Sequence, residues 1–387
     1  MIIGVLKETF PGEQRVAFSP ANIKAMAKND NLTFYVQESA GVASGLLDEE
    51  YQAVGATITS RETIWAEANV ICQVHSGGSN ATLSEHDIAN LRPDQVVIGM
   101  ADPLANPAFA QQVAEKGASA IALELVPRIT RAQSMDVLSS NAMLAGYKAV
   151  LTAASESKQM FPMNMTAAGT LSPAKVFIMG AGVAGLQACA TAKRLGAVVS
   201  AYDIRPEAQE QILSVGAKPI QLDLTAEKGE GGYAKEQSTE FIKRQQELMT
   251  EVMVQQDVII TTAAIPGRPS PILVTEEQVK AMKPGSVIVD LAAERGGNCA
   301  LTRLGETVVE HGVTIVGPAN VPACLPAHGS QMYGKNMENF LKLLVAEDGS
   351  LNFDFDDEII KDTVMTYQGE VVNNRIRGLL NLPVNEA

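Results

Sequence analysis

Residues 175–203 read KVFIMGAGVAGLQACATAKRLGAVVSAYD, and this stretch determines the fold that we expect for the chain. An apolar run of strand length precedes three glycines, Gly180, Gly182 and Gly185, in the spacing GxGxxG. A helical pattern closed by a further glycine follows, and a second apolar run then ends at Asp203. The order of strand, glycine turn, helix, strand and acid is typical of the first βαβ unit of a doubly wound parallel sheet.

Each residue of this motif has a physical role in binding a dinucleotide. Gly180 permits a tight turn, Gly182 allows the backbone to approach a pyrophosphate, and Gly185 allows the helix to pack closely on the strand. Asp203, about 20 residues further on, accepts hydrogen bonds from ribose hydroxyls and repels a 2′-phosphate. The pattern therefore predicts NAD(H) in preference to NADP(H). Arg205 weakens the distinction, because an arginine near this strand end can bind a 2′-phosphate.

Strand-like and helix-like segments alternate on both sides of this stretch, which predicts an α/β protein with two doubly wound parallel-sheet (Rossmann-like) domains. In the second domain the strands are expected at residues 174–182, 197–203, 218–223, 257–263, 286–292 and 313–320. In the first domain they are expected at residues 1–8, 32–39, 68–75, 95–100 and 118–126.

The first domain is expected to be discontinuous, because a helical pattern at 328–345 follows the last predicted strand and indicates a return of the chain. We expect an N-terminal domain of residues 1–138 plus 325–387, and an NAD(H)-binding domain of residues 139–324 inserted into it. Long helices near 139–160 and 328–345 would connect them. A cleft that separates the two domains is the expected NAD-binding site.

Composition excludes several classes of function. The chain has 30 basic and 44 acidic residues, a formal charge of −14, which argues against nucleic acid as a partner. Its four cysteines lack metal-ligand spacing and its four histidines are scattered, so no metal site is expected. No signal-peptide pattern and no apolar run of about 18 residues is visible, so we expect a cytoplasmic protein with free thiols.

Two connecting segments carry more chemistry than a plain loop needs. Residues 127–140, PRITRAQSMDVLSS, contain two arginines, a glutamine and an aspartate between a strand and a helix. They form either a ligand loop or a solvated loop with an Arg–Asp pair and Ser139 or Ser140 as helix cap. Residues 225–241, TAEKGEGGYAKEQSTEF, form either a lid over a ligand or an ordinary surface loop.

The chain resembles the NAD(H)-binding component, domain I or the alpha (alpha-1) subunit, of proton-translocating nicotinamide nucleotide transhydrogenase. That family is related to alanine dehydrogenase. The resemblance covers nearly the whole chain. It rests on PRITRAQSMDVLSS, MTAAGTLSPAKVFIMGAGVAGLQACATAKRLGA, GGYAKE, TTAAIPGRP and GSVIVDLAAERGGNC.

The resemblance implies roles for particular residues. The family holds the nicotinamide end of NAD(H) with an Arg-Gln-Asp loop, and Arg128, Gln133 and Asp136 match it, with Ser139 as a neighbouring contact. Further nucleotide contacts are implied at Gly182, Val183, Asp203, Ile204, Arg205 and Gln245, and at Ala264, where a leucine is more usual. The tip of the family's mobile lid matches Gly232 and Tyr233.

The resemblance also implies an activity and partners. NADH would pass hydride directly to NADP+ held on a partner domain, coupled to proton translocation, and the chain would be active only with its partner subunits. Those partners would be a membrane-spanning proton-channel subunit and an NADP(H)-binding subunit, with the chain itself a homodimer. The protein would be peripheral on the inner face of the plasma membrane.

Two other functions stay open at this point. Alanine dehydrogenase shares both domains, and Arg15 matches its N-terminal arginine. His75 lies near the position of its expected lysine, its expected histidine is missing, and Glu294 replaces its aspartate. On these residues His75 is expected to be partly exposed and without a role. The second alternative is a non-catalytic NAD(H)-binding regulatory module.

Overall fold

The structure, a computed structural model, describes residues 1–82, 84–221 and 239–385. The chain divides into two compact units, Met1–Asn141 with Ala323–Ala387, and Ala142–Pro322. The unit boundaries therefore fall at 141/142 and 322/323, close to the 138/139 and 324/325 that the sequence predicts.

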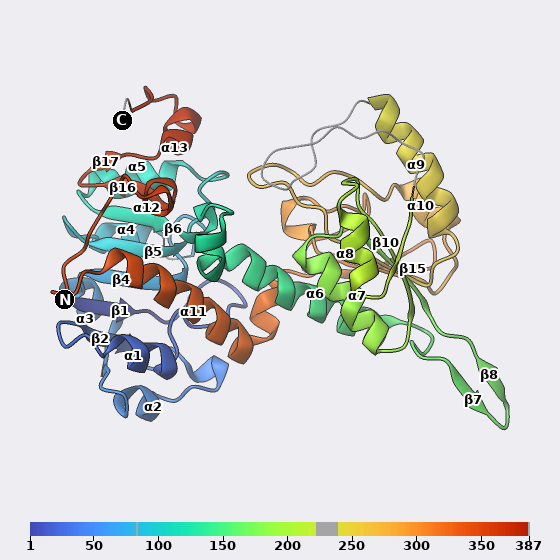
Figure 1. Ribbon diagram of the computed structural model, residues 1–387, viewed down its shortest axis with the longest axis horizontal. Helices are drawn as coiled ribbons and strands as arrows, with labels where there is room; N and C mark the ends of the chain where they lie inside the picture. The colour runs from blue at the N-terminus through green and yellow to red at the C-terminus, as the bar shows by residue number, and fades with distance from the viewer. Residues whose placement is uncertain (83, 222–238, 386–387) are drawn as a thin grey trace. The chain divides into compact units, whose positions relative to one another are not determined.

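Within the described residues, the first unit is built on an eight-stranded sheet in the order β17-β16-β6-β5-β4-β1-β2-β3 (Figure 1). Its strands are β1 Ile2–Val5, β2 Thr33–Gln37, β3 Thr57–Thr59, β4 Val70–His75, β5 Val96–Met100, β6 Ser119–Ala122, β16 Val364–Tyr367 and β17 Glu370–Val371. Strands β1 to β6 pair in parallel, while β16 is antiparallel to β6 and to β17. The strand order reverses its direction between β1 and β4, and ligands commonly bind beyond the carboxyl ends of strands at such a point.

The helices of the first unit connect these strands. The α-helices are α1 Pro20–Met26, α2 Asp48–Gln52, α3 Arg61–Glu67, α4 Ser84–Asn90, α5 Ala108–Glu115, α11 Pro326–Leu344, α12 Glu358–Thr363 and α13 Asn374–Leu379. The 3-10 helices are η1 Val42–Ser44, η2 Leu123–Leu125 and η3 Thr130–Met135. Helix α6, Val137–Glu156, carries the chain across the unit boundary. Helix α1 begins as expected, with Ser19 accepting the N–H of Asn22 and Pro20 in the first turn.

The second unit has a seven-stranded sheet among its described residues, in the order β11-β10-β9-β12-β13-β15-β14. The strands are β9 Lys175–Met179, β10 Val198–Tyr202, β11 Lys218–Pro219, β12 Val258–Thr261, β13 Val287–Asp290, β14 Thr307–Glu310 and β15 Val313–Val316. Its helices are α7 Val183–Arg194, α8 Ala208–Ser214, α9 Thr239–Met253, α10 Glu276–Ala281, η4 Ala293–Arg295 and η5 Val321–Cys324. All pairs are parallel except β14 with β15.

Both sheets bury both faces, as parallel sheets with helices on each side require. In β9, Val176 and Ile178 pack into one apolar cluster, and Phe177 and Met179 pack into another. The first unit repeats this arrangement with two clusters of its own. These observations confirm the predicted fold class of doubly wound, Rossmann-like α/β units.

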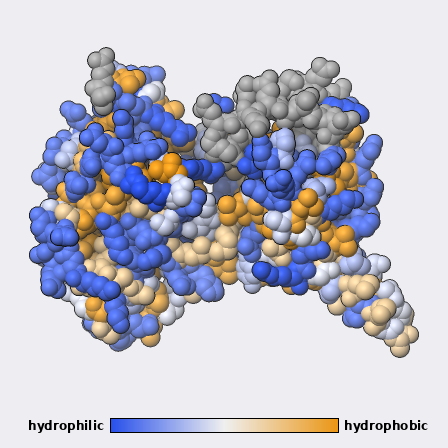
Figure 2. Space-filling view, in the orientation of Figure 1, coloured by the Kyte–Doolittle hydropathy of each residue, from blue (hydrophilic) through white to orange (hydrophobic). Residues whose placement is uncertain are grey.

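The strands at the margins of the sheets are not predicted by the sequence. Strands β3, β14, β16 and β17 extend the edges, and β7 Asn164–Thr166 forms an isolated hairpin with β8 Gly169–Leu171. The hairpin is exposed throughout, including Met165 at 74%, and Figure 2 shows its pale orange, weakly hydrophobic surface projecting from the second unit. Edge and hairpin strands lack a continuous buried face, so their sequences carry no strong apolar signal.

A buried carboxyl group joins the central strands of the first sheet. Glu8 follows β1, and its two oxygens accept the backbone N–H groups of Val74 and His75 at the end of β4. Burial raises the pKa of Glu8 from its ordinary value of 4.5 to about 8, although these N–H groups and the nearby Arg15 oppose the rise. The folded protein therefore keeps Glu8 protonated in a pH range where the unfolded chain ionises it.

Glu8 should make the free energy of unfolding fall as the pH rises. Its stabilising contribution is complete below pH 4.5 and is lost as the pH rises through about 8, because the unfolded chain releases the proton first. Glu8→Gln should remove this slope, which for one proton is at most about 1.4 kcal/mol per pH unit.

The measurement is urea unfolding of the wild type and Glu8→Gln at several pH values between 5 and 8, for which the pKa of about 8 sets the window. The lost hydrogen bond of the variant shifts all values by a constant and leaves the slope readable. Glu115→Gln, at an exposed position, is the control and should keep the wild-type slope. Parallel curves for wild type and Glu8→Gln would show that Glu8 is ionised in the folded protein.

Candidate functional site

The glycine turn of the second unit has an open side and a closed side. Gly180 has a φ of 105°, which favours glycine, and Gly182 precedes the first residue of α7. A Cβ on Gly182 would meet no atom of the described residues within 4 Å, whereas a Cβ on Gly185 would lie 1.8 Å from the carbonyl oxygen of Gly180. Gly182 therefore faces open space, and Gly185 permits close packing of α7 on β9.

The N-terminus of α7 is suited to an anion. No side chain in the described part of the protein caps it, so its first N–H groups are available where the helix dipole is positive. Val183 is the first residue of the helix and is exposed to 44%. These features fit the diphosphate of a dinucleotide, because a Cβ at Gly182 would occupy the space that the phosphates need.

Asp203 is bound to the glycine turn. One oxygen accepts the N–H of Ala181 at 2.7 Å, and Arg205 donates to both oxygens through Nε and Nη2 at 2.9 Å. Burial acts to raise the pKa of Asp203, but the bonds from Arg205 and the backbone outweigh it and hold the pKa below the ordinary value. Asp203 is thus an ionised acid at the carboxyl end of β10, with Ile204 between it and its arginine partner.

Ala264 lies in a loop after β12 that is fixed at both ends by one side chain. Asn298 is fully buried, exchanges hydrogen bonds with the N–H and carbonyl of Ala263, and also donates to the carbonyl of Pro271. The backbone N–H of Asn298 in turn donates to Asp290 at the end of β13. The sequence pattern alone assigns Asn298 no role, although this residue stands in the stretch ERGGNC.

The second unit therefore brings together most of the nucleotide contacts predicted for it. Gly180, Gly182, Gly185, Val183, Asp203, Ile204 and Arg205 surround the junction of β9, α7 and β10, and Ala264 follows the neighbouring strand β12. Gln245 lies on helix α9. Gly232 and Tyr233 lie outside the described residues.

The Arg-Gln-Asp loop of the first unit contains the short helix η3. Ala132 and Met135 point into the core of this unit, while Arg128 and Gln133 are exposed. Asp136 accepts the backbone N–H of Ser139 at 2.9 Å and its hydroxyl at 2.6 Å. Asp136 thus has the capping position before α6 that a solvated loop would give to Ser139 or Ser140.

Arg15, the residue shared with alanine dehydrogenase, already binds a carboxylate of its own chain. It is 2% exposed, and its Nε and Nη2 donate to the two oxygens of Glu13 at 2.8 and 2.6 Å. His75 lies 3.1 Å from the same carboxylate and stacks on Phe10 with ring centroids 4.3 Å apart. Burial acts to raise the pKa of Glu13, but Arg15 and His75 outweigh it and hold the pKa below the ordinary value.

These contacts change the interpretation of three residues. The side chain of His75 is 13% exposed and has partners on both sides of its ring, so this histidine has a structural role in holding Glu13. Glu13 is not recognisable from the sequence, although it stands only two residues before Arg15. Glu294, the residue in place of an aspartate, accepts the backbone N–H of Asn320 at 2.9 Å.

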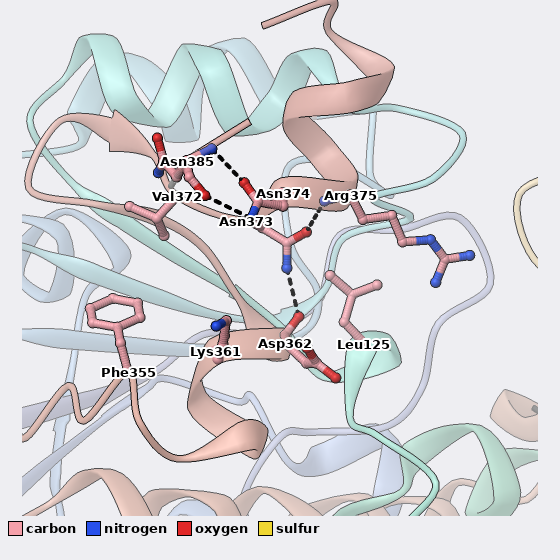
Figure 3. A pocket seen from close by; sticks show the side chains of 9 residues that line it. All are labelled: Leu125, Phe355, Lys361, Asp362, Val372, Asn373, Asn374, Arg375 and Asn385. Carbon is pink, nitrogen blue, oxygen red and sulfur yellow. Dashed lines mark hydrogen bonds between the residues drawn. The ribbon is translucent and has the colours of Figure 1, made fainter. Parts of the chain in front are cut away.

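A hollow in the first unit has no comparable chemistry. It measures about 340 Å³ and lies beside the start of α13 (Figure 3). Asn373 caps α13 by accepting the N–H groups of Arg375 and Ile376, and its amide donates to the carbonyl of Asp362. In the described residues no group of three or more His, Cys, Asp or Glu side chains is placed to bind a metal ion. None of the helices in that same part of the chain is both long and apolar enough to cross a bilayer.

Comparisons with known proteins agree with this arrangement. Residues 4–145 match the family Alanine dehydrogenase/PNT, N-terminal domain, and residues 149–374 match Alanine dehydrogenase/PNT, C-terminal domain. The chain is 44% identical over 384 residues to the alpha-1 chain of the NAD(P) transhydrogenase of Rhodospirillum rubrum, covering 98% of this chain and 99% of that protein. It is 41% identical over 375 residues to NAD(P) transhydrogenase subunit alpha of Haemophilus influenzae, covering 96% and 72%.

Solved structures give the same result. The crystal structure of transhydrogenase from Sinorhizobium meliloti superposes with a TM-score of 0.86 at 44% identity, covering 96% of this chain and all of that one. An L-alanine dehydrogenase structure superposes with a TM-score of 0.79 at 22% identity and shows the shared fold. On the domain matches and these identities, the chain belongs to the alanine dehydrogenase/PNT family, on the side of its transhydrogenase alpha subunits.

Proposed function

We propose that this protein is the NAD(H)-binding alpha-type subunit of a proton-translocating NAD(P) transhydrogenase. The observation that supports this best is the uncapped N-terminus of α7 within the described residues, with open space at Gly182 and the ionised Asp203 beside it. The relatives named NAD(P) transhydrogenase subunit alpha support the reaction class, and the word subunit in their names supports action within a larger assembly.

The chain's contribution to the reaction would be binding and orientation. NADH supplies the hydride, so the protein needs no acid, base or nucleophile of its own. In the second unit, the amides of α7 would bind the diphosphate and Asp203 the adenosine ribose. In the first, Gln133 and Arg128 present exposed polar groups, and Asp136 sits at the end of the same loop. These groups would hold the nicotinamide carboxamide and set the ring toward NADP+ on a partner.

Alanine dehydrogenase is the weaker candidate because of Glu13. A keto-acid carboxylate needs a cation, and the guanidinium of Arg15 is buried in a two-bond contact with an internal carboxylate. Displacing Glu13 would leave a buried carboxylate without its main partner, which costs several kcal/mol. The identity to an alanine dehydrogenase, 29% to that of Bacillus subtilis, is also lower than to the transhydrogenase subunits.

The finer parts of the proposal concern partners and place. The chain would act as a homodimer with a membrane-spanning proton-channel subunit and an NADP(H)-binding subunit, peripheral on the inner face of the plasma membrane. Gly232, Tyr233 and Gln245 would contribute to the NADH site, the first two as a lid. A non-catalytic NAD(H)-binding module is the alternative if no partner can draw hydride from the bound NADH.

A paired assay on the purified protein tests the function. One reaction contains NADH, pyruvate and ammonium, and the other contains NADH, the NADP+-loaded partner subunit of a transhydrogenase and a thio-NADP+ acceptor. Turnover in the second reaction alone supports the transhydrogenase. Turnover in the first alone would make the protein an alanine dehydrogenase, and NADH binding without either turnover would favour the regulatory module.

The glycine turn allows affinity and stability to be separated. Gly182→Ala should fold with unchanged stability, since its Cβ meets no described atom within 4 Å, yet lower NADH affinity about tenfold or more by occupying the space of the phosphates. Gly185→Ala should instead lower the free energy of unfolding by about 1–3 kcal/mol or more, because its Cβ overlaps the carbonyl of Gly180. NADH fluorescence titration and urea unfolding of both variants measure the two effects. Normal NADH affinity in Gly182→Ala would place the dinucleotide elsewhere.

Gln133 should affect the rate of transfer more than binding. Gln133→Asn shortens the side chain by one methylene and misplaces the nicotinamide ring by about 1 Å, which costs about a hundredfold in rate. The affinity for NADH should change far less, because most contacts with the dinucleotide remain. Single-turnover hydride transfer in the complex with the partner, together with NADH titration, gives both quantities. Equal losses in rate and affinity would contradict a positioning role for Gln133.

A further inference from the structure

The loop that carries Gln133 is held in place by residues to which neither the sequence nor the proposed function assigns a role. Its buried side is anchored by Ala132 and Met135 in the core of the first unit. The exposed side chains next to Gln133 are those of Arg131 and Ser134. Hydrogen bonds from segments more than 200 residues further along the chain hold the loop at both of these positions.

Arg131 forms a two-bond ion pair with Asp357. Its Nη1 and Nη2 each donate to one oxygen of Asp357 at 2.7 Å, and the side chains are 53% and 15% exposed. Asp357 is itself fixed, because it caps α12 by accepting the N–H of Ile359 at 2.8 Å. An ion pair this exposed contributes little to stability, but its fork geometry fixes the direction of the arginine.

Ser134 is held through its carbonyl oxygen by helix α11. Asn336 and Asn339 both donate to this oxygen from their side-chain amides, at 2.9 and 3.1 Å. Asn336 is 6% exposed, and its own Oδ1 is buried with no hydrogen-bond partner in the described part of the chain. An unpaired buried oxygen costs about 1–3 kcal/mol, so Asn336 is a poor choice for stability alone.

We propose that Arg131, Asn336 and Asn339 are positioning residues for hydride transfer, an inference that rests on the proposed transhydrogenase function. They touch the backbone or the anchor of the loop and leave Gln133 available to meet the nicotinamide. The two contacts flank Gln133, one on each side, so they set its height above the core. The unpaired oxygen of Asn336 is then a loss of stability that is offset by accuracy of position.

Asn336→Leu separates this role from a structural one. The leucine has similar size and removes both the contact with Ser134 and the unpaired oxygen. The midpoint of urea unfolding should therefore stay equal or rise, while single-turnover hydride transfer in the complex with the NADP+-loaded partner should fall about tenfold to a hundredfold and NADH affinity should change by about twofold at most. A structural role would move stability and rate in the same direction.

Asp357→Ser tests the other contact without loss of the helix cap. Serine is a good N-cap for α12 but is too short to reach Arg131. Transfer should fall as in Asn336→Leu, and Asp357→Asn, which retains one acceptor for Arg131, should recover part of the rate. The control is Glu276→Ser, which breaks an exposed ion pair with Lys280 at the start of α10 and should leave rate and affinity unchanged.

The outcomes distinguish the inference from the function on which it rests. Wild-type transfer with unaffected Asn336→Leu and Asp357→Ser would overturn the positioning role alone. Loss of unfolding free energy in proportion to loss of rate would also overturn it, in favour of a structural role. Absence of transfer in the wild type would overturn the proposed function and this inference together.

Discussion

The close approach of helix α7 to strand β9 is the constraint on which the second unit depends. Gly185 stands against the carbonyl of Gly180, at a distance that excludes even a methyl group. This contact brings the first turn of α7 over the carboxyl edge of the sheet, where no described side chain caps its N–H groups. The turn then receives Asp203 through the N–H of Ala181, so that the ends of two strands and one helix meet at one place.

Acidic side chains that accept backbone N–H groups beyond strand ends recur in both units. Glu8 joins the end of β1 to the end of β4, and Glu124 accepts the N–H groups of Ala101 and Asp102 after β5. Asp290 accepts the N–H groups of Ala292, Asn298 and Cys299 after β13. Loops at the carboxyl edges are therefore fixed by internal acids. At Gly182, by contrast, the described residues leave a helix N-terminus uncapped against open space.

The parts of the fold that sequence could predict are those with a periodic physical cause. The strands β9, β12, β13 and β15 are apolar runs buried on both faces, and the glycine spacing determines the turn after β9. Edge strands such as β14 alternate exposed and half-buried residues over four positions, too short a pattern to recognise. Long-range polar contacts left no local signal: nothing in the sequence around Arg131 indicates Asp357, and nothing around Arg15 shows that Glu13 fills its guanidinium fork.

The first unit is assembled from segments that the second unit separates in the chain. Strand β16 pairs with β6, and the hydroxyl of Tyr333 on α11 donates to the carbonyl of Gln73, 260 residues away. During synthesis the continuous second unit is complete before these segments leave the ribosome, so it can fold while the first sheet still lacks β16 and its covering helix. The closing of the first unit is a late event with a high contact order, and truncation of the C-terminal segment would leave an open sheet edge at β6 that invites pairing with other chains.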